Sequence, residues 1–199
     1  MIAVVDYNAG NIRSVLCALE RLGAKAELTC ERDKILSADR VIFPGVGQAE
    51  SAMAELEKRG LVETLRQVKR PFLGICLGMQ LMNAFSEEGD VNLLSLFDNR
   101  VSLFPSDLGF KIPHVGWNSI SFNSSPLFEG IESGSYVYYV HSYYVPLSSS
   151  TIASTDYDNL TFTASMAKDN FFGCQFHPEK SGEVGERILK NFLSLEVEK

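Results

Sequence analysis

The sequence predicts an α/β fold in which helices cover both faces of a central, mostly parallel sheet. In the first half of the chain, short apolar runs alternate with amphipathic segments. Strands that alternate with helices imply right-handed crossovers between parallel strands. From about residue 101 to 175 the chain is rich in Phe, Tyr, Val, Ser and Thr, which is typical of shorter, partly antiparallel strands. We expect residues 1–199 to form a single domain, because no repeat or linker interrupts them.

The expected elements of the first half follow from apolar periodicity. Buried apolar runs predict strands at residues 2–5, 25–29, 40–43 and 71–75. Helical spacing predicts helices at residues 12–22, 49–58, 62–68 and 78–85. Gly23 follows the first helix as a stop signal, and Gly60 separates the second from the third. A last helix is expected at about residues 183–195.

Composition and charge exclude several classes of function. Hydrophobic residues make up 45% of the chain and charged residues 22%, as in an ordinary globular protein. The formal net charge of -7 would repel a phosphate backbone, so we expect no nucleic-acid partner. We also expect no membrane span and no signal peptide, and therefore a cytoplasmic protein, because no apolar run is long enough.

The four cysteines show no metal-site or Cys-x-x-Cys spacing. Cys17, Cys30 and Cys174 are expected to be small buried hydrophobic side chains. Cys76 differs, because it lies between Gly74 and Gly78 where a predicted strand runs into a predicted helix.

Gly-x-Cys-x-Gly at a strand-to-helix turn is the cysteine form of the nucleophile elbow. Side chains two residues before and after the nucleophile would collide, which explains Gly74 and Gly78. The helix N-terminus favours the thiolate of Cys76, and the backbone N–H of Leu77 is available to an oxyanion. A buried cysteine beside packing glycines is the alternative interpretation.

A general base for Cys76 is expected at His177, one of only three histidines. It follows an apolar run and precedes Pro178, which would fix it at an exposed strand end. Glu179 lies two residues further on, and side chains two apart in an extended segment point to the same side. Its carboxylate would then fix the imidazole tautomer and stabilise the imidazolium.

Two segments resemble the signatures of class I glutamine amidotransferases, namely residues 74–80 (GICLGMQ) and 176–181 (FHPEKS). Four further segments are similar to the glutaminase subunits of imidazole glycerol phosphate synthases: residues 6–11, 43–47, 113–118 and 140–143. The resemblance covers the chain from end to end. It implies a flavodoxin-like fold with extra strands, and glutamine hydrolysis in histidine biosynthesis.

The resemblance also implies roles for individual residues. Cys76, His177 and Glu179 match a catalytic triad. Positions whose backbone amides face the oxyanion are matched by Val46 and Leu77. Positions that hold the amino-acid end of glutamine are matched by Gly47, Gln80, Ser142 and Tyr143. Alternatively, Gln80 faces solvent, and Ser142 and Tyr143 are ordinary strand residues. The remaining histidines, His114 and His141, are expected to be structural or to line a partner face.

The chemistry implied by the resemblance needs no metal and no organic cofactor. The ammonia must be handed directly to an acceptor, and the chain is too short to hold a second substrate domain. Family resemblance names the acceptor as a (βα)8-barrel cyclase subunit in a heterodimer. Asn11, Trp117 and Lys180 lie in the similar segments and suit a docking surface: an amide, an aromatic anchor and a cation. Residues 44–47 (PGVG) are either a switch that turns the Val46 N–H or a simple tight turn.

Three other functions remain open from the sequence. One is a different class I glutaminase, such as the subunit paired with the pyridoxal phosphate synthase barrel. Another is a free-standing cysteine hydrolase that uses water as its acceptor. The third is a non-enzymatic regulatory subunit, which would have no need of an intact Cys-His-Glu set.

Overall fold

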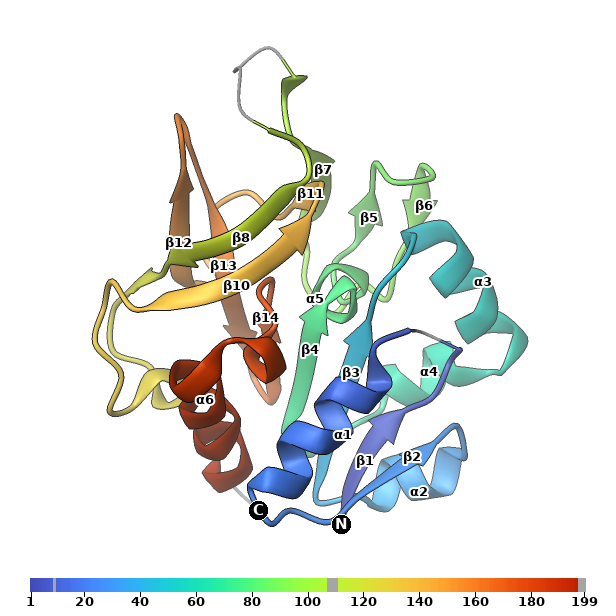
Figure 1. Ribbon diagram of the computed structural model, residues 1–199. Coiled ribbons are helices and arrows are strands. Elements are labelled where there is room, and N and C mark those ends of the chain that lie inside the picture. The colour runs from blue at the N-terminus through green and yellow to red at the C-terminus, as the bar shows by residue number, and fades with distance from the viewer. Residues whose placement is uncertain (9, 107–110, 197–199) are drawn as a thin grey trace.

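The computed structural model describes residues 1–8, 10–106 and 111–196, and its centre is a twisted sheet (Figure 1). Among these residues the sheet has eight strands, in the order β2 (Ala26–Thr29), β1 (Ile2–Val5), β3 (Arg40–Gly45), β4 (Phe72–Cys76), β14 (Phe171–Cys174), β13 (Leu160–Lys168), β12 (Thr151–Tyr157) and β9 (Ser121–Phe122). The pairings from β2 to β14 are parallel. Those from β14 to β9 are antiparallel. The predicted α/β fold is therefore confirmed.

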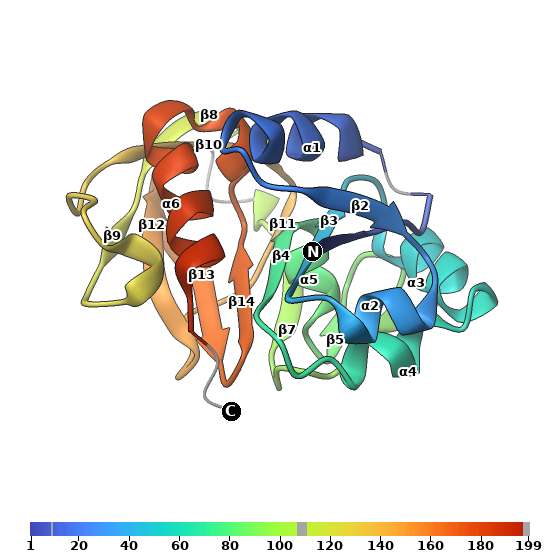
Figure 2. The ribbon, with the colours of Figure 1, turned by 90° about the horizontal axis from the view of Figure 1, so that it is seen from below.

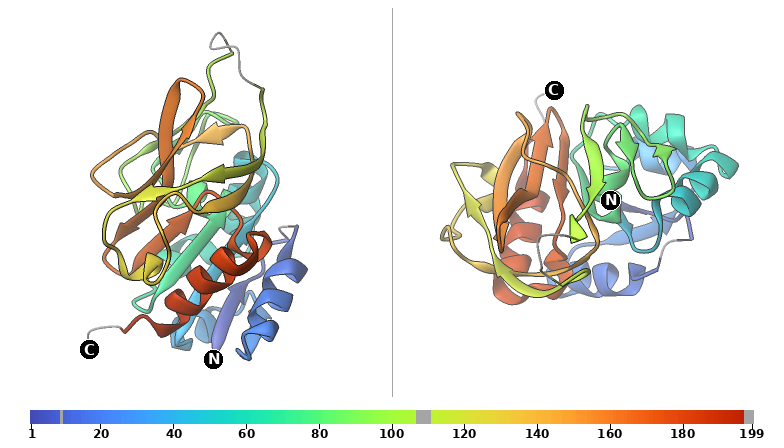
Figure 3. Two further views of the ribbon diagram at one scale, coloured as in Figure 1. Left: turned by 60° about the vertical axis from the view of Figure 1, so that its left-hand side comes forward. Right: turned by 90° about the horizontal axis from the view of Figure 1, so that it is seen from above.

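Helices cover both faces of this sheet (Figure 2). On one face lie α1 (Ile12–Arg21) and α6 (Gly182–Ser194), which run side by side and are joined by the Arg21–Glu186 ion pair (Figure 3). The other face is covered by α2 (Arg32–Ser37), α3 (Ala49–Lys58) and α4 (Leu61–Arg66). Each face buries its own apolar cluster against the sheet, so both sides of the parallel strands are protected from water.

Residues from Phe85 onward add two smaller sheets, within the described residues, beside the central one. One consists of β11 (Tyr143–Tyr144), β7 (Arg100–Leu103), β5 (Phe85–Ser86) and β6 (Val91–Asn92). The other pairs β8 (His114–Ser119) with β10 (Tyr136–His141), and we call this pair the β8–β10 ribbon. The described part of the chain also contains the 3-10 helices η2 (Pro126–Phe128) and η3 (Pro178–Lys180).

Hydrogen bonds hold the β8–β10 ribbon against the chain segment that follows β14. The N–H of His177 donates to the carbonyl of Tyr138 at 2.9 Å, and the N–H of Tyr138 donates to the Ser181 hydroxyl at 3.0 Å. Val115, Trp117, Tyr136 and Val140 are exposed on this ribbon. The ribbon thus covers the end of the central sheet with one face and leaves apolar side chains bare on the other.

Several predicted boundaries differ from the structure for physical reasons. The helix expected at residues 78–85 is shorter, and forms α5 (Leu77–Leu81). It ends there because the side-chain Nδ2 of Asn83 donates hydrogen bonds to the carbonyl oxygens of Met79 and Gln80, in place of backbone N–H groups further along. The strand expected at 40–43 continues to Gly45, which pairs with Cys76. The short helix α2 was not predicted. No helix among the described residues is long and apolar enough to cross a bilayer.

Candidate active site

Cys76 lies at the sharp turn where the chain passes from strand β4 into helix α5. Its backbone has φ 52° and ψ -110°, a conformation that residues other than glycine rarely adopt. Such strained residues cluster at active sites, where the surrounding structure over-determines them. The turn presents the sulfur of Cys76 toward the β8–β10 ribbon rather than into the sheet.

The glycines on either side of Cys76 are required by close packing. A Cβ at Gly78 would lie 1.8 Å from the carbonyl oxygen of Phe43, and one at Gly74 would lie 2.8 Å from the N of Met79. Neither contact leaves room for a methyl group. The collision expected from the elbow motif is therefore found at both positions.

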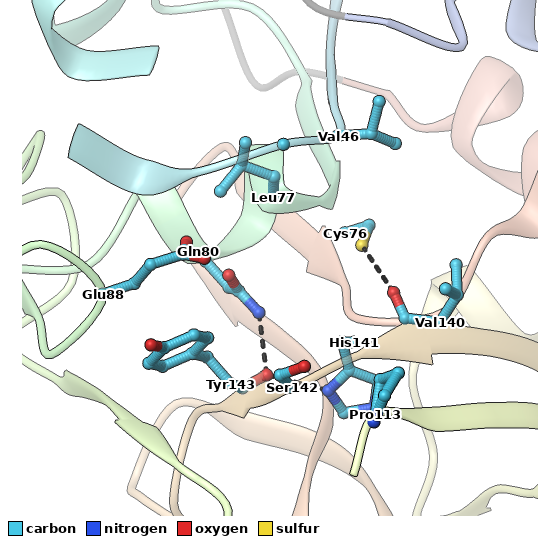
Figure 4. Close-up of a pocket in the computed structure, with 11 residues that line it drawn as sticks. Val46, Cys76, Leu77, Gln80, Glu88, Pro113, Val140, His141, Ser142 and Tyr143 are labelled. Carbon is cyan, nitrogen blue, oxygen red and sulfur yellow. Dashed lines mark hydrogen bonds between the residues drawn. The ribbon is translucent and has the colours of Figure 1, made fainter. Parts of the chain in front are cut away.

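The thiol of Cys76 rests between two groups. It donates toward the carbonyl oxygen of Val140, 3.8 Å away (Figure 4). The side-chain Nε2 of Gln175 lies 3.8 Å from the sulfur. The Nε2 of His177 has no hydrogen-bond partner among the described residues, although it is buried. The thiol thus rests against these two groups, and no hydrogen bond from another described residue competes for Nε2 of His177.

His177 and Glu179 form a buried pair. The Nδ1 of His177 lies 2.8 Å from Oε1 of Glu179, and His177 is only 1% exposed. Its expected exposure was wrong, because the β8–β10 ribbon covers it. The contact with Glu179 was predicted, but it arises from the one-turn helix η3 rather than from an extended segment. Burial opposes the charge on His177, but Cys76 and Glu179 outweigh burial and raise its pKa.

A pocket of about 320 Å³ opens beside Cys76. The residues expected around the substrate and oxyanion all line it, namely Val46, Gly47, Cys76, Leu77, Gln80, Ser142 and Tyr143 (Figure 4). Gln80 does not face solvent, since it is 4% exposed and its Nε2 donates to the carbonyl of Tyr143 at 2.8 Å.

The pocket also contains a carboxylate that the sequence did not single out. Glu88 lines it and accepts the N–H of Ala49, the first residue of α3, at 2.8 Å. Burial raises the pKa of Glu88, and the N–H of Ala49 partly offsets that effect. The pocket therefore brings the strained Cys76 thiol and a half-buried carboxylate into one cavity.

Comparison with known families agrees with this geometry. The family model described as glutamine amidotransferase class-I matches residues 3–195. The chain belongs to the class I glutamine amidotransferases. Curated relatives of this amidotransferase include imidazole glycerol phosphate synthase subunit HisH of Bacteroides fragilis strain YCH46, 54% identical over 98% of this chain and 99% of its own length. The subunit of that name from Haemophilus influenzae strain Rd is 46% identical over 96% of each chain.

Solved structures show the same fold for the amidotransferase. A structure described as a glutamine amidotransferase superposes with a TM-score of 0.74 at 16% identity, over 97% of both chains. A structure described as PurLQS from Thermotoga maritima gives a TM-score of 0.70 at 19% identity, over 96% of both chains.

The residues expected at a partner interface lie in two different environments. Trp117 is 55% exposed on the β8–β10 ribbon, so it is not a core residue of the amidotransferase, and Lys180 is also exposed. Asn11 is half-buried, and its Nδ2 donates to Oε1 of Glu179 at 2.8 Å. Asn11 therefore contacts the His–Glu pair, which sequence reasoning did not predict. Ala9, in the same segment, lies outside the described residues.

The remaining cysteines and histidines of the amidotransferase differ from expectation in one respect. Cys17 and Cys30 are exposed rather than buried, whereas Cys174 is buried. Cys17 is not among the buried residues of α1, and Cys30 lies between β2 and α2. His114 and His141 are buried and hydrogen-bonded to each other at 3.0 Å. Burial lowers the pKa of His114 to about 4 and that of His141 to about 3.

Proposed function

We propose that this chain is the glutaminase subunit of imidazole glycerol phosphate synthase, a cytoplasmic enzyme of histidine biosynthesis. It hydrolyses glutamine through Cys76, His177 and Glu179, and passes ammonia to a (βα)8-barrel cyclase subunit in a heterodimer. The observation that carries the chemistry is the strained Cys76 in a pocket beside the buried His177–Glu179 pair. The choice of the cyclase as the ammonia acceptor is supported by the relatives, which are named as subunits of imidazole glycerol phosphate synthase.

In the first half of the reaction, the Cys76 sulfur attacks the carboxamide carbon and its proton passes to Nε2 of His177. The resulting oxyanion faces the N–H groups of Val46 and Leu77. Leu77 is the first residue of α5, so its N–H has no partner within the helix. Loss of one such donor typically lowers turnover by about 100-fold to 1000-fold. His177 then protonates the departing nitrogen, and ammonia leaves a glutamyl thioester.

In the second half, His177 takes a proton from water, and the hydroxide formed attacks the thioester. Glutamate is released and the thiol returns. Glu179 accepts a hydrogen bond from Nδ1 of His177, which leaves Nε2 as the nitrogen that exchanges protons. The additional hydrogen bond from Asn11 orients the same carboxylate oxygen.

The amino-acid end of glutamine lies at the other side of the pocket. Glu88 supplies the negative charge that pairs with an α-ammonium group, and Gly47, Gln80, Ser142 and Tyr143 complete the walls. An ammonium ligand favours a carboxylate at hydrogen-bond distance. This assignment explains why a pocket otherwise lined by neutral groups contains a half-buried carboxylate.

The cyclase docks on the outer face of the β8–β10 ribbon. Trp117, Val115, Tyr136 and Val140 form an exposed apolar surface there, and such surfaces mark protein interfaces. The carbonyl of Val140 contacts the Cys76 thiol, so the docking face and the nucleophile share one strand. Lys180 and Asn11 complete the proposed interface near the His177–Glu179 pair.

The reaction is tested by measuring glutamate release from the chain with and without the candidate cyclase. We expect release to depend strongly on the cyclase and to be abolished by Cys76→Ala with the fold retained. A glutamine-shaped electrophile should label Cys76. Because Cys17 and Cys30 are exposed, a general alkylating reagent is unsuitable here. Labelling by the glutamine analogue at another cysteine would contradict the assignment.

The docking face is tested by Trp117→Ala, with Leu147→Ala as the control. Leu147 is 53% exposed and Trp117 is 55% exposed, but only Trp117 lies on the ribbon. We expect Trp117→Ala to weaken cyclase binding by about 10-fold or more, as for an aromatic hot spot, and Leu147→Ala to leave it unchanged. Equal affinities for both variants would show that the docking face is elsewhere.

A further inference from the structure

Gln175 is a completely buried polar residue between β14 and η3 that the triad chemistry leaves unexplained. Its side-chain amide touches two groups. Nε2 lies 3.8 Å from the sulfur of Cys76, and Oε1 lies 3.0 Å from Nε2 of Gln80. A buried amide of this kind is kept only when its hydrogen bonds are made, and one of them ends on the proposed nucleophile.

The orientation of this amide is fixed by its neighbours. The carbonyl oxygen of Tyr143 can only accept, so Gln80 must present its Nε2 there, at 2.8 Å. The second hydrogen of the same Nε2 reaches Gln175, which must therefore present Oε1. It follows that Nε2 of Gln175 faces the sulfur. Rotating either amide by 180° would place like groups against each other.

The Tyr143 carbonyl that anchors this arrangement is itself held by a histidine pair. Nδ1 of His141 donates to it at 2.8 Å, so Nε2 of neutral His141 accepts from Nδ1 of His114 at 3.0 Å. The carbonyl thus receives two donors, one from His141 and one from Gln80, which fills both lone pairs. A continuous set of hydrogen bonds runs from His114 to the sulfur of Cys76.

We infer that Gln175 is a further catalytic residue, whose side-chain N–H donates to the Cys76 sulfur and stabilises the thiolate that attacks glutamine. This inference rests on the proposed function. A thiol is a weak acceptor, whereas a thiolate is a charged one, so the bond from Gln175 strengthens as the proton leaves. The contact with the Val140 carbonyl changes in the opposite sense, because a thiolate has no proton to donate to it.

The pH dependence of Cys76 alkylation tests this role directly. In a Cys17→Ser, Cys30→Ser background, we would measure the iodoacetamide rate at Cys76 by peptide mass spectrometry. Gln175→Met removes the N–H donor, and Gln175→Glu keeps an acceptor for Gln80 but places a carboxylate against the sulfur. We expect the pH of half-maximal alkylation to rise by about one unit in the Met variant and further in the Glu variant.

Other titrating groups are common to all variants compared. The titratable groups that face Cys76 are His177 and Tyr7. Glu179 and His141 in turn lie close to His177. Gln67→Glu is the matched control, since Gln67 is exposed and its side chain is hydrogen-bonded to Arg32 alone among the described residues. It adds the same charge and should leave the alkylation profile unchanged. If both Gln175 variants fold and alkylate as the parent does, the inference is wrong.

A measurement on the unaltered chain covers the case in which the Gln175 variants do not fold. With glutamine side chains labelled with 15N, the Nε2 resonance of Gln175 should move as Cys76 titrates and lose that response in Cys76→Ala. A Gln175 Nε2 resonance whose chemical shift does not change as Cys76 is titrated would also overturn the inference. Neither test uses glutamine hydrolysis, so failure of the proposed function would appear separately, as glutaminase activity that persists in Cys76→Ala.

Discussion

Glu88→Gln tests how the pocket recognises its substrate. The change keeps the size of the side chain and removes the negative charge that we pair with the α-ammonium of glutamine. A hydrogen bond to a charged group contributes roughly 1.5–3 kcal/mol, and about 1.4 kcal/mol corresponds to a factor of ten. Because Glu88 is only half-buried, solvent screens part of this energy. We therefore expect kcat/KM for glutamine to fall by about 10-fold to 30-fold.

The decisive assay compares two substrates in the presence of the cyclase. Glutamine carries the α-ammonium, whereas 4-carbamoylbutyrate has the same amide without it. The parent protein should prefer glutamine, and Glu88→Gln should lose most of that preference by weakening glutamine alone. Glu87→Gln is the control, because Glu87 is paired with Arg100 and the N–H of Leu103 outside the pocket. An equal loss for both substrates would refute the pairing.

Three further changes have definite expected outcomes. Gly78→Ala should lower the free energy of unfolding by about 1–3 kcal/mol or more in urea titrations, because its Cβ would lie 1.8 Å from the Phe43 carbonyl. His114 and His141 have pKa values of about 4 and 3 when folded, so the unfolded chain binds more protons below about pH 6.5 and stability should fall as pH drops from there toward 4. His114→Phe should make that decline shallower in unfolding curves, and an unchanged slope would contradict the assignment of the titrating group. Gly47→Ala should alter glutaminase turnover and its dependence on the cyclase if the 44–47 loop is a switch. The reason is that φ of Gly47 is +114°, which alanine rarely adopts, while the space around the added Cβ is open. Unchanged kinetics would show that the loop is a simple turn.

Substitution of Gly45 by alanine, in the same loop, would be a poor probe of the switch. A Cβ at Gly45 would lie 2.2 Å from the hydroxyl oxygen of Tyr7 and 3.1 Å from Cβ of Leu77. The variant would therefore disturb the packing of the nucleophile turn as well as the peptide that follows it. Gly47 separates these effects, because, apart from Gly47 itself and its two neighbours in the chain, no described residue has a heavy atom within 4 Å of the position that a Cβ would take there.

The parts of the fold that the sequence predicts are those with strong local signals. The strand at residues 2–5 is a continuous apolar run, and the helix at 12–22 has helical apolar spacing followed by Gly23. Helix α2 has six residues, too few to show a period, and β5 and β6 have two residues each. Helix α2 packs against α4, and β5 joins its sheet through β7, and no local pattern reveals these contacts.

The same division applies to the site. Cys76 lies in a local motif, and the contact between His177 and Glu179 spans two residues, so both could be predicted. Glu88 and Gln175 could not, because an isolated Glu or Gln looks like any surface residue until the tertiary structure places it beside the pocket or the sulfur. Exposure of His177 was predicted wrongly for a related reason, since the covering ribbon comes from another part of the chain.

The position of β14 has a consequence for how the protein is made. This strand enters the sheet between β4 and β13, and it brings to Cys76 a glutamine that lies 99 residues further along the chain. Long-range parallel pairings form slowly, and a ribosome delivers the C-terminal part last. A nascent chain from which Cys76 has already emerged therefore still lacks both Gln175 and His177, and on the mechanism proposed above it cannot yet hydrolyse free glutamine.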